Sequence, residues 1–180
     1  MRIPLIVSWK GRTASARTDK LTNIGVDILP TMFESAGIAQ PKKLPGRSVL
    51  PVALGNHTGP WRDHLVAQNN MSQTGTVDGI RPTMEGRMVR TDRYKYCVYE
   101  YGTRRESLFD LKNDPDETTD LAGDPKFQDI LVQHRALLTG FGKEHSDALV
   151  AKLLADNVKP VPFPAAPPKN SKRKRARTGK

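Results

Sequence analysis

Four short runs of strand-forming residues lie between residues 64 and 110, and turn-forming residues separate them. They predict strands at 64–68, 87–91, 94–101 and 106–110. Apolar residues with helical spacing follow at 127–138, after the capping pair Asp124-Pro125, and a second helix is predicted at about 146–155. This order of elements predicts a small antiparallel sheet with a helix packed across one face, which is an α+β fold.

The residues before this sheet have a different pattern. Residues 3–9 are almost all apolar, so they predict a strand that is buried on both faces of a sheet. No neighbour for such a strand is evident, and we therefore expect the rest of its sheet to lie upstream. Residues 27–37 predict a helix with one buried apolar face, with Asp27 as N-cap, Pro30 in the first turn and Gly37 as a left-handed C-terminal cap. Residues 46–51 are typical of a surface loop.

The positive charge of the chain is concentrated at its C-terminal end. There are 29 Lys and Arg against 19 Asp and Glu, a net charge of +10, and seven of the cations lie in residues 169–180, which contain no acid. Because prolines crowd residues 160–168, we expect 158–180 to be a disordered basic tail. The single cysteine excludes an intramolecular disulfide. No apolar run is long enough to span a bilayer, and no signal-peptide pattern is present, so the compartment is left unassigned.

Two motifs resemble the C-terminal end of type I sulfatases. They are G-R-M-V-R-T-D-R-Y-K-Y at residues 86–96 and E-S-L-F-D-L-K-N-D-P-D-E-T-T-D-L-A at residues 106–122. Residues 2–9 are similar to the family's R-x-P-x-I-x-x-W strand, and the helix that follows is similar to its N-x-x-D-x-x-P-T helix. Because these motifs occur in the family's order, the chain is identified as a member of this family, of the alkaline phosphatase-like superfamily, from residue 1 to about 140.

The resemblance implies three parts. Residues 1–58 would be the C-terminal strand and helix of the sulfatase α/β domain, 59–157 the α+β subdomain and 158–180 the tail. A full-length parent would carry calcium and a formylglycine made from a C/S-x-P-x-R motif, and it would be exported. That motif is absent here, and the family's metal ligands lie before residue 2. No catalytic residue, metal ligand or cofactor is therefore assigned to this chain, which we expect to be inactive alone.

Three features could imitate a reactive site. Cys97 lies in the middle of a predicted strand, where a small packed side chain is a better interpretation than a nucleophile. Asp63-His64 resembles a metal-binding pair but opens a strand and lacks the surrounding context of a metal site. The acidic residues from Asp110 to Asp120 lack the glycine and glutamate of an EF-hand loop, and turn chemistry around Asn113 explains them better.

Residues 69–87 are predicted to form a long polar loop between two strands, and loops of this length are commonly functional. In sulfatases the C-terminal subdomain often helps to wall the substrate cleft. The resemblance therefore makes Asn69, Asn70, Arg81 and Arg87 candidate contacts to a sulfated substrate, since a guanidinium matches the oxygens of sulfate. A merely solvated loop is the competing interpretation, and it is the more favoured of the two.

Two hypotheses of function follow. In the first, the chain is the C-terminal part of a sulfuric ester hydrolase that acts on a sulfated carbohydrate or aryl sulfate, and it meets its substrate only within a full-length chain. In the second, it is a free-standing, sulfatase-derived binding module whose basic tail contacts polyanions. The tail lacks aromatic residues that could stack on bases, so specific nucleic-acid recognition is not expected.

Overall fold

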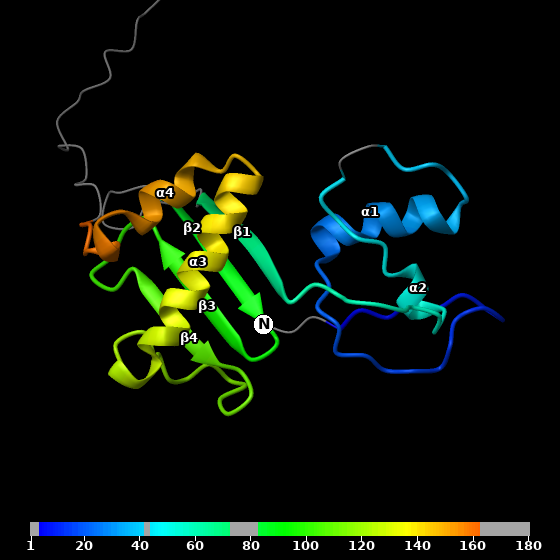
Figure 1. Cartoon of the computed structure of the whole chain (residues 1–180), viewed down its shortest axis with the longest axis horizontal. Coiled ribbons are helices and arrows are strands. Elements are labelled where there is room, and N and C mark those ends of the chain that lie inside the picture. Colours follow the sequence, from blue (N-terminus) through cyan, green and yellow to red (C-terminus); the bar gives the residue numbers. More distant parts are fainter. Residues whose placement is uncertain (1–3, 42–43, 73–82, 163–180) are drawn as a thin grey trace, which may run out of the picture. The chain divides into compact units, whose positions relative to one another are not determined.

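The computed structural model describes residues 4–41, 44–72 and 83–162. These residues divide into two compact units, which we describe separately. The N-terminal unit runs up to Leu65 and includes the turn 90–93, and the sheet unit comprises the remaining described residues (Figure 1). Arg81 and residues 163–180 of the predicted tail lie outside the described residues. Residues 158–162 are described and do not form a disordered segment as predicted, because Val158 is buried in the core and Val161 pairs with Gly102. The predicted boundaries at 58 and 157 remain predictions.

The principal helix of the N-terminal unit is α1 (Ile24–Ser35). Its N-cap is Asn23, whose side chain accepts a hydrogen bond from Gly25 N at 3.0 Å, so the prediction of Asp27 as the cap is wrong. An asparagine is as good a cap as an aspartate, and it stands four residues earlier. Pro30 consequently lies inside the helix rather than in its first turn.

The C-terminal cap of α1 agrees with the prediction. Gly37 has a φ of +68°, which is the left-handed conformation that glycine adopts without strain. Its N–H donates to Glu34 O at 3.1 Å, and the N–H of Ile38 donates to Phe33 O at 2.9 Å. These two bonds form a Schellman motif, which satisfies the last carbonyls of the helix.

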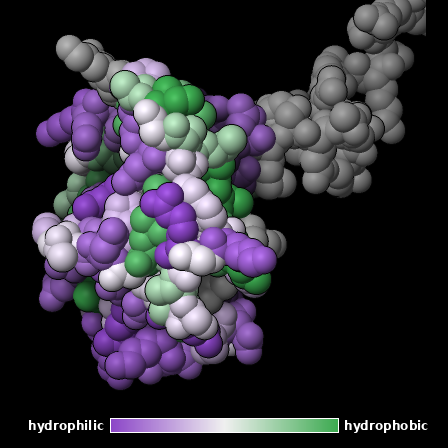
Figure 2. All heavy atoms as spheres, turned by 90° about the vertical axis from the view of Figure 1, so that its right-hand side faces the viewer, coloured by the Kyte–Doolittle hydropathy of each residue, from purple (hydrophilic) through white to green (hydrophobic). Residues whose placement is uncertain are grey.

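The predicted strand at residues 3–9 is not formed. Residues 4–9 have no regular secondary structure, and Ile6 is 86% exposed. The apolar face predicted to be buried on α1 is also open, with Met32 61% exposed. Eight of the nine large apolar side chains that are exposed among the described residues belong to this unit: Leu5, Ile6, Val7, Ile24, Ile28, Leu29, Met32 and Ile38. Figure 2 shows hydrophobic residues at the surface among hydrophilic ones. A strand that lacks neighbours cannot form its ladder, which is the physical reason for the difference.

A short helix, α2 (Leu50–Ala53), begins where the sequence predicted a loop. Pro51 occupies its first turn, where a missing N–H has no cost. Four residues are too few to show a helical period, so the sequence pattern could not reveal this element.

The sheet unit is built on four strands in the order β1-β2-β3-β4. They are β1 (His64–Ser72), β2 (Thr83–Thr91), β3 (Tyr94–Tyr99) and β4 (Glu106–Asp110). In the antiparallel pair β3·β4, Tyr94 lies opposite Asp110 and Val98 lies opposite Glu106. The predicted α+β fold with an antiparallel sheet is thereby confirmed. β1 and β2 are longer than predicted and take up both ends of the predicted 69–87 loop, whereas β3 ends two residues early.

Helix α3 (Gln128–Glu144) lies across one face of the sheet (Figure 1). It follows the 3-10 turn η1 (Pro125–Phe127), which Asp124 caps as predicted by accepting from Lys126 N at 2.9 Å. Helix α4 (Ala148–Leu154) and the 3-10 turn η2 (Ala155–Val158) complete the layer. None of the helices built by the described residues is long and apolar enough to cross a bilayer.

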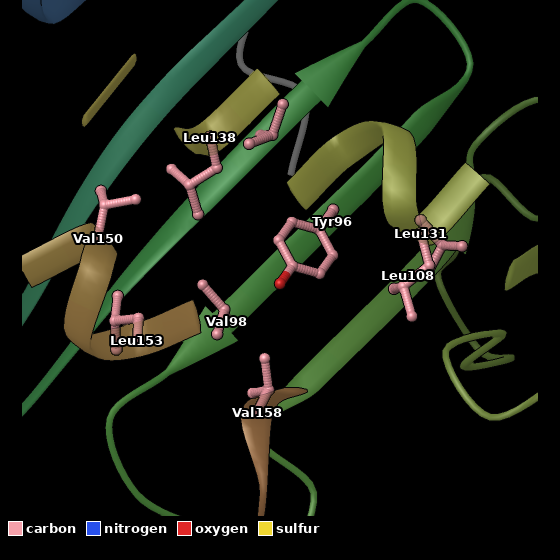
Figure 3. Close-up of a cluster of buried hydrophobic side chains, with 9 residues drawn as sticks. Tyr96, Val98, Leu108, Leu131, Leu138, Val150, Leu153 and Val158 are labelled. Atoms are coloured by element: carbon pink, nitrogen blue, oxygen red, sulfur yellow. The ribbon is translucent and has the colours of Figure 1, made fainter. Parts of the chain in front are cut away.

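The core lies between the sheet and these helices. Tyr96 and Val98 are two residues apart on β3 and therefore share one face of the sheet. They point toward α3 and α4, where they pack with Leu138 and Leu153 (Figure 3). Nine buried residues form this cluster: Val89, Tyr96, Val98, Leu108, Leu131, Leu138, Val150, Leu153 and Val158. The sheet unit thus has a complete apolar core of its own, in contrast to the N-terminal unit.

Candidate functional site

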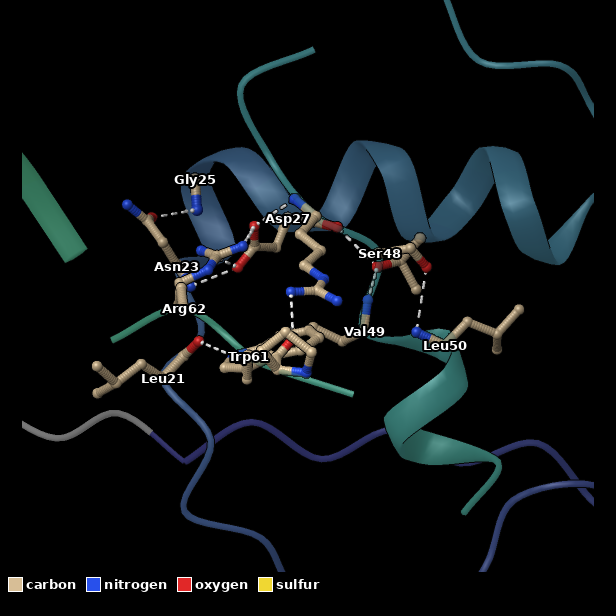
Figure 4. A network of polar contacts seen from close by, with 12 residues as sticks. Leu21, Asn23, Gly25, Asp27, Ser48, Val49, Leu50, Trp61 and Arg62 are labelled. Atoms are coloured by element: carbon tan, nitrogen blue, oxygen red, sulfur yellow. Dashed lines mark hydrogen bonds and ion pairs between the residues drawn. The ribbon is translucent and has the colours of Figure 1, made fainter. Parts of the chain in front are cut away.

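The residues of the N-x-x-D-x-x-P-T motif hold the N-terminal unit together. Asp27 is 1% exposed, and its carboxylate accepts four hydrogen bonds (Figure 4). Two come from the guanidinium of Arg62 at 2.8 and 2.9 Å, one from Asn23 N at 2.7 Å and one from Arg47 N at 2.8 Å. We call Asp27 and these three partners the Asp27 cluster. It joins three segments that are up to 35 residues apart, which gives this motif a structural role.

Neighbouring contacts extend this cluster. Thr31 Oγ1 accepts from Val49 N at 3.0 Å and donates to Asp27 O of its own helix at 2.6 Å. Together with the bond from Arg47 N to Asp27, this contact binds the segment before α2 to α1 at two points. Gly46 lies so close to α1 that a Cβ placed on it would lie 1.8 Å from Val26 O. Trp61 donates from Nε1 to Leu21 O at 2.6 Å.

A hollow of about 190 Å³ opens on the sheet, and we call it the sheet hollow. The ring of Tyr99 packs directly on Gly86 at this hollow, where a Cβ on residue 86 would lie 2.9 Å from Cδ1 of Tyr99. The residues that line it come from β1, β2 and β3: Ala67, Gln68, Asn69, Gly86, Arg87, Met88, Cys97 and Tyr99. The lining therefore includes apolar residues, such as Ala67 and Met88, and the polar residues Asn69 and Tyr99.

Cys97 is buried in β3, as predicted for a small packed side chain. Burial raises the pKa of its thiol above the ordinary value, because a thiolate would lose its hydration there. Burial likewise raises the pKa of Tyr99 to about 12. At neutral pH both groups are protonated, so the sheet hollow offers hydrogen-bond donors and no nucleophile.

The structure brings two of the candidate contact residues, Asn69 and Arg87, to the sheet hollow. Asn69 lies on exposed β1 at the sheet hollow, and Asn70 donates from Nδ2 to Glu85 Oε1 at 3.4 Å. Arg87 is 8% exposed, and the three nitrogens of its guanidinium each donate one hydrogen bond, two to Asp147 at 2.7 and 3.1 Å and one to Gly86 O at 2.8 Å. Arg87 therefore lines the sheet hollow beside Asn69, but its bonds to Asp147 and Gly86 hold the guanidinium in place.

Asp147, which the sequence did not indicate, is the acidic partner of Arg87. Besides Arg87 it accepts from Gln68 Nε2 at 3.1 Å. The hydrogen bond from Arg87 holds the pKa of the Asp147 carboxyl below its ordinary value. Asp147 stands 60 residues after Arg87 in the sequence, and no local pattern marks such a pairing.

Asp63-His64 and the acidic residues after Asp110, which resemble metal sites in the sequence, have local explanations. His64 Nδ1 and Asp63 Oδ1 bond to each other at 2.6 Å, and Asp63 is 87% exposed. Asp110 accepts from Lys112 N at 3.2 Å and from Asn113 Nδ2 at 2.9 Å, which is the predicted turn chemistry. Within 4–41, 44–72 and 83–162, no group of three or more His, Cys, Asp or Glu residues could hold a metal ion.

The order of elements, the Asp27 cluster and the sheet with α3 define the C-terminal region of a sulfatase, and comparison with known proteins agrees. Residues 1–143 match the family described as N-sulphoglucosamine sulphohydrolase, C-terminal, and the chain belongs to this family. It is 40% identical over 121 residues to a Delta 4,5-hexuronate-2-O-sulfatase of Bacteroides thetaiotaomicron, and 33% identical over 132 residues to human arylsulfatase K.

Solved structures show the same fold. A 2-O GAG sulfatase is 36% identical, with a TM-score of 0.64 over 74% of this chain and 28% of that protein. A phosphonate monoester hydrolase of Agrobacterium radiobacter, at 20% identity and a TM-score of 0.52, shares the fold alone. The matches cover 67% of this chain and 24% of the Bacteroides enzyme, and 71% and 23% for the human one. The chain thus spans about a quarter of the length of the curated relatives it matches.

Proposed function

We propose that this chain is the C-terminal part of a sulfuric ester hydrolase and cleaves sulfate esters only when joined to the part that carries formylglycine and calcium. The observation that carries the proposal is the exposed apolar surface of the N-terminal unit. An apolar surface of this kind is expected to be covered by another part of a protein. The matched relatives are about four times as long as the matched segment, so a further part exists in those proteins.

The proposal predicts that the purified chain alone does not turn over a chromogenic aryl sulfate, with calcium present. The reason is that the chemistry needs a geminal-diol nucleophile and a metal ion, and neither has a counterpart in this sequence. A matched reaction with a full-length relative gives the positive control. Turnover by the chain itself, unaffected by further purification, would refute the proposal.

A second test reads the DNA upstream of the Met1 codon in the same frame. An open frame with a C/S-x-P-x-R motif and an Asp-His or Asp-Asn pair would support a sulfatase whose start lies further upstream. An in-frame stop codon just before a credible start would instead favour the binding-module hypothesis.

We propose a sulfated carbohydrate as the substrate class of the full-length parent. Two of the relatives in the comparison carry names that refer to sulfated uronates or glycosaminoglycans. Among the candidate contacts, Asn69 is the best placed, because its amide is exposed at the sheet hollow. Arg87 would act by holding β2 and Asp147 in position, and Asn70 and Arg81 remain candidates from the sequence.

In a full-length chain, Asn69→Ala should raise KM for a sulfated disaccharide several-fold and leave kcat nearly unchanged, because it removes a binding group. The matched control is Gln128→Ala, which removes an amide at the start of α3. An unchanged KM for Asn69→Ala would remove this residue from the proposed site.

The alternative function is a free-standing module that binds polyanions. It rests on the seven cations in residues 169–180. Affinity for heparin should then fall steeply with salt, and deletion of those residues should abolish it. Such binding by itself would not distinguish the two functions, whereas the upstream reading frame does.

A further inference from the structure

A buried arginine in the sheet unit has no acidic partner among residues 4–41, 44–72 and 83–162. Arg105 is 6% exposed, and its guanidinium donates to three backbone carbonyls: Tyr99 O at 2.8 Å, Lys159 O at 3.0 Å and Leu153 O at 3.1 Å. A guanidinium has five N–H groups, and these bonds use three of them. The other buried arginine, Arg87, is neutralised by Asp147, and this contrast makes Arg105 unusual within the described residues.

Arg105 lines a hollow of about 330 Å³, which we call the basic hollow. Its walls come from the end of β3, from α4 and from the segment after α4: Glu100, Tyr101, Arg105, Lys152, Ala155, Lys159, Pro160 and Val161. Three of these side chains are cationic and one is anionic. Glu100 is already neutralised, since it accepts from Lys152 Nζ at 2.6 Å, and this bond lowers its pKa.

The charge balance of the basic hollow favours an anion. A buried cation is costly unless an anion or enough hydrogen bonds compensate it. Carbonyl dipoles compensate Arg105 in part, because Leu153 O lies at the negative end of α4. A ligand with several acceptor oxygens could take up the remaining N–H groups in the fork geometry that suits sulfate and phosphate.

We propose that the basic hollow binds a tetrahedral oxyanion, either free sulfate or the sulfate group of a saccharide, between Arg105 and Lys159. This site is separate from the sheet hollow, and the inference does not rest on the proposed function. Two elements close it: the segment after α4 is held by Arg105, and Val161 pairs with Gly102 through hydrogen bonds of 2.8 and 3.1 Å. A bound oxyanion would therefore fasten this segment to the β3–β4 connection.

The test is an NMR titration of the whole chain with sodium sulfate and, separately, with N-acetylglucosamine 6-sulfate. Sodium chloride keeps the ionic strength constant. Saturable shifts should occur at the amides of Gly102, Arg105 and Val161. Shifts with both ligands identify the oxyanion itself as the recognised group, whereas shifts with the sugar alone identify a saccharide-borne sulfate, and either result supports the site.

The variants Lys159→Gln and Lys126→Gln each remove one cation. Lys159 lines the basic hollow, whereas Lys126 lies in η1 and does not. Lys159→Gln should weaken binding about fivefold, as expected for the loss of one partly exposed charge contact, and Lys126→Gln should leave the affinity unchanged. Neither side chain belongs to the core, so both variants should fold.

Three results would overturn the inference. They are no saturable shift with either ligand, shifts confined to residues 169–180, and an equal loss of affinity in the two variants. The last two would show attraction to positive charge in general. None of these results would bear on the proposed hydrolase function, which is tested by turnover and by the upstream reading frame.

Discussion

Replacement of Asp27 by asparagine should destabilise the N-terminal unit by about 3 kcal/mol. Each carboxylate oxygen of Asp27 accepts two hydrogen bonds, one from Arg62 and one from a backbone N–H of Asn23 or Arg47. An asparagine in either orientation would place its NH₂ group against two donors. Two hydrogen bonds would be lost, and the half-buried guanidinium of Arg62 would lose its counterion.

The magnitude follows from these contacts. An unsatisfied buried group costs about 1–3 kcal/mol, and breaking a buried ion pair costs about 3–5 kcal/mol. Arg62 keeps 18% of its side-chain surface and can recover part of its hydration. The lower end of the ion-pair range, about 3 kcal/mol, is therefore the expected loss.

Tryptophan fluorescence during urea unfolding measures this loss selectively. Trp9 and Trp61, which are both of the tryptophans in the chain, lie in the N-terminal unit, and the four tyrosines lie in the sheet unit. The tryptophan transition should move to lower urea, and near-ultraviolet circular dichroism of the tyrosines should follow the sheet unit separately. Glu34→Gln is the matched control, because Glu34 is an exposed acid of the same helix.

A loss below about 1 kcal/mol for Asp27→Asn would refute this account of the cluster. So would strictly additive effects of Asp27→Asn and Arg62→Met, because residues that bond directly should be coupled. In either case the motif around Asp27 would need an explanation other than structural support.

Two further predictions concern the sheet unit. Gly140→Ala should stabilise it by about 1 kcal/mol through helix propensity, whereas Gly142→Ala should destabilise it by about 1–2 kcal/mol. The reason is that a Cβ meets nothing within 4 Å at Gly140 but lies 2.9 Å from Val150 Cβ at Gly142. Thermal unfolding that gives the same sign for both variants would contradict this packing. For Asp147, the pKa in the folded state lies below the value of 3.8 for an unperturbed aspartate, so the unfolded state binds more protons. The pairing of Arg87 with Asp147 should therefore stabilise the unit fully above pH 3.8 and lose its effect as the pH falls through the folded-state pKa. Asp147→Asn should reduce the dependence of the unfolding free energy on pH in that window. An unchanged pH dependence would show that the pair is not coupled to folding.

Local sequence patterns were sufficient where a contact is short in sequence. The runs of strand-forming residues between turns, the Asp124-Pro125 start and the Gly37 cap all act within a few residues, and the structure has each of them. The pattern for residues 3–9 correctly marks an apolar segment, but a strand needs partners, and residues 4–9 have none within the described chain. The apolar face of α1 was likewise marked correctly as apolar, but the residues that the structure describes do not cover it.

What the sequence by itself determined is the α+β fold of the sheet unit and the family to which the chain belongs. Only the tertiary structure decided which charges meet. Asp27 binds Arg62 across 35 residues, Arg87 binds Asp147 across 60, and Arg105 reaches Lys159 O across 54. Such pairs depend on how strands and helices are brought together, and the energy of a buried charge depends on partners that no local pattern specifies. The pairing of Arg87 with Asp147 and the carbonyl partners of Arg105 are consequences of that packing.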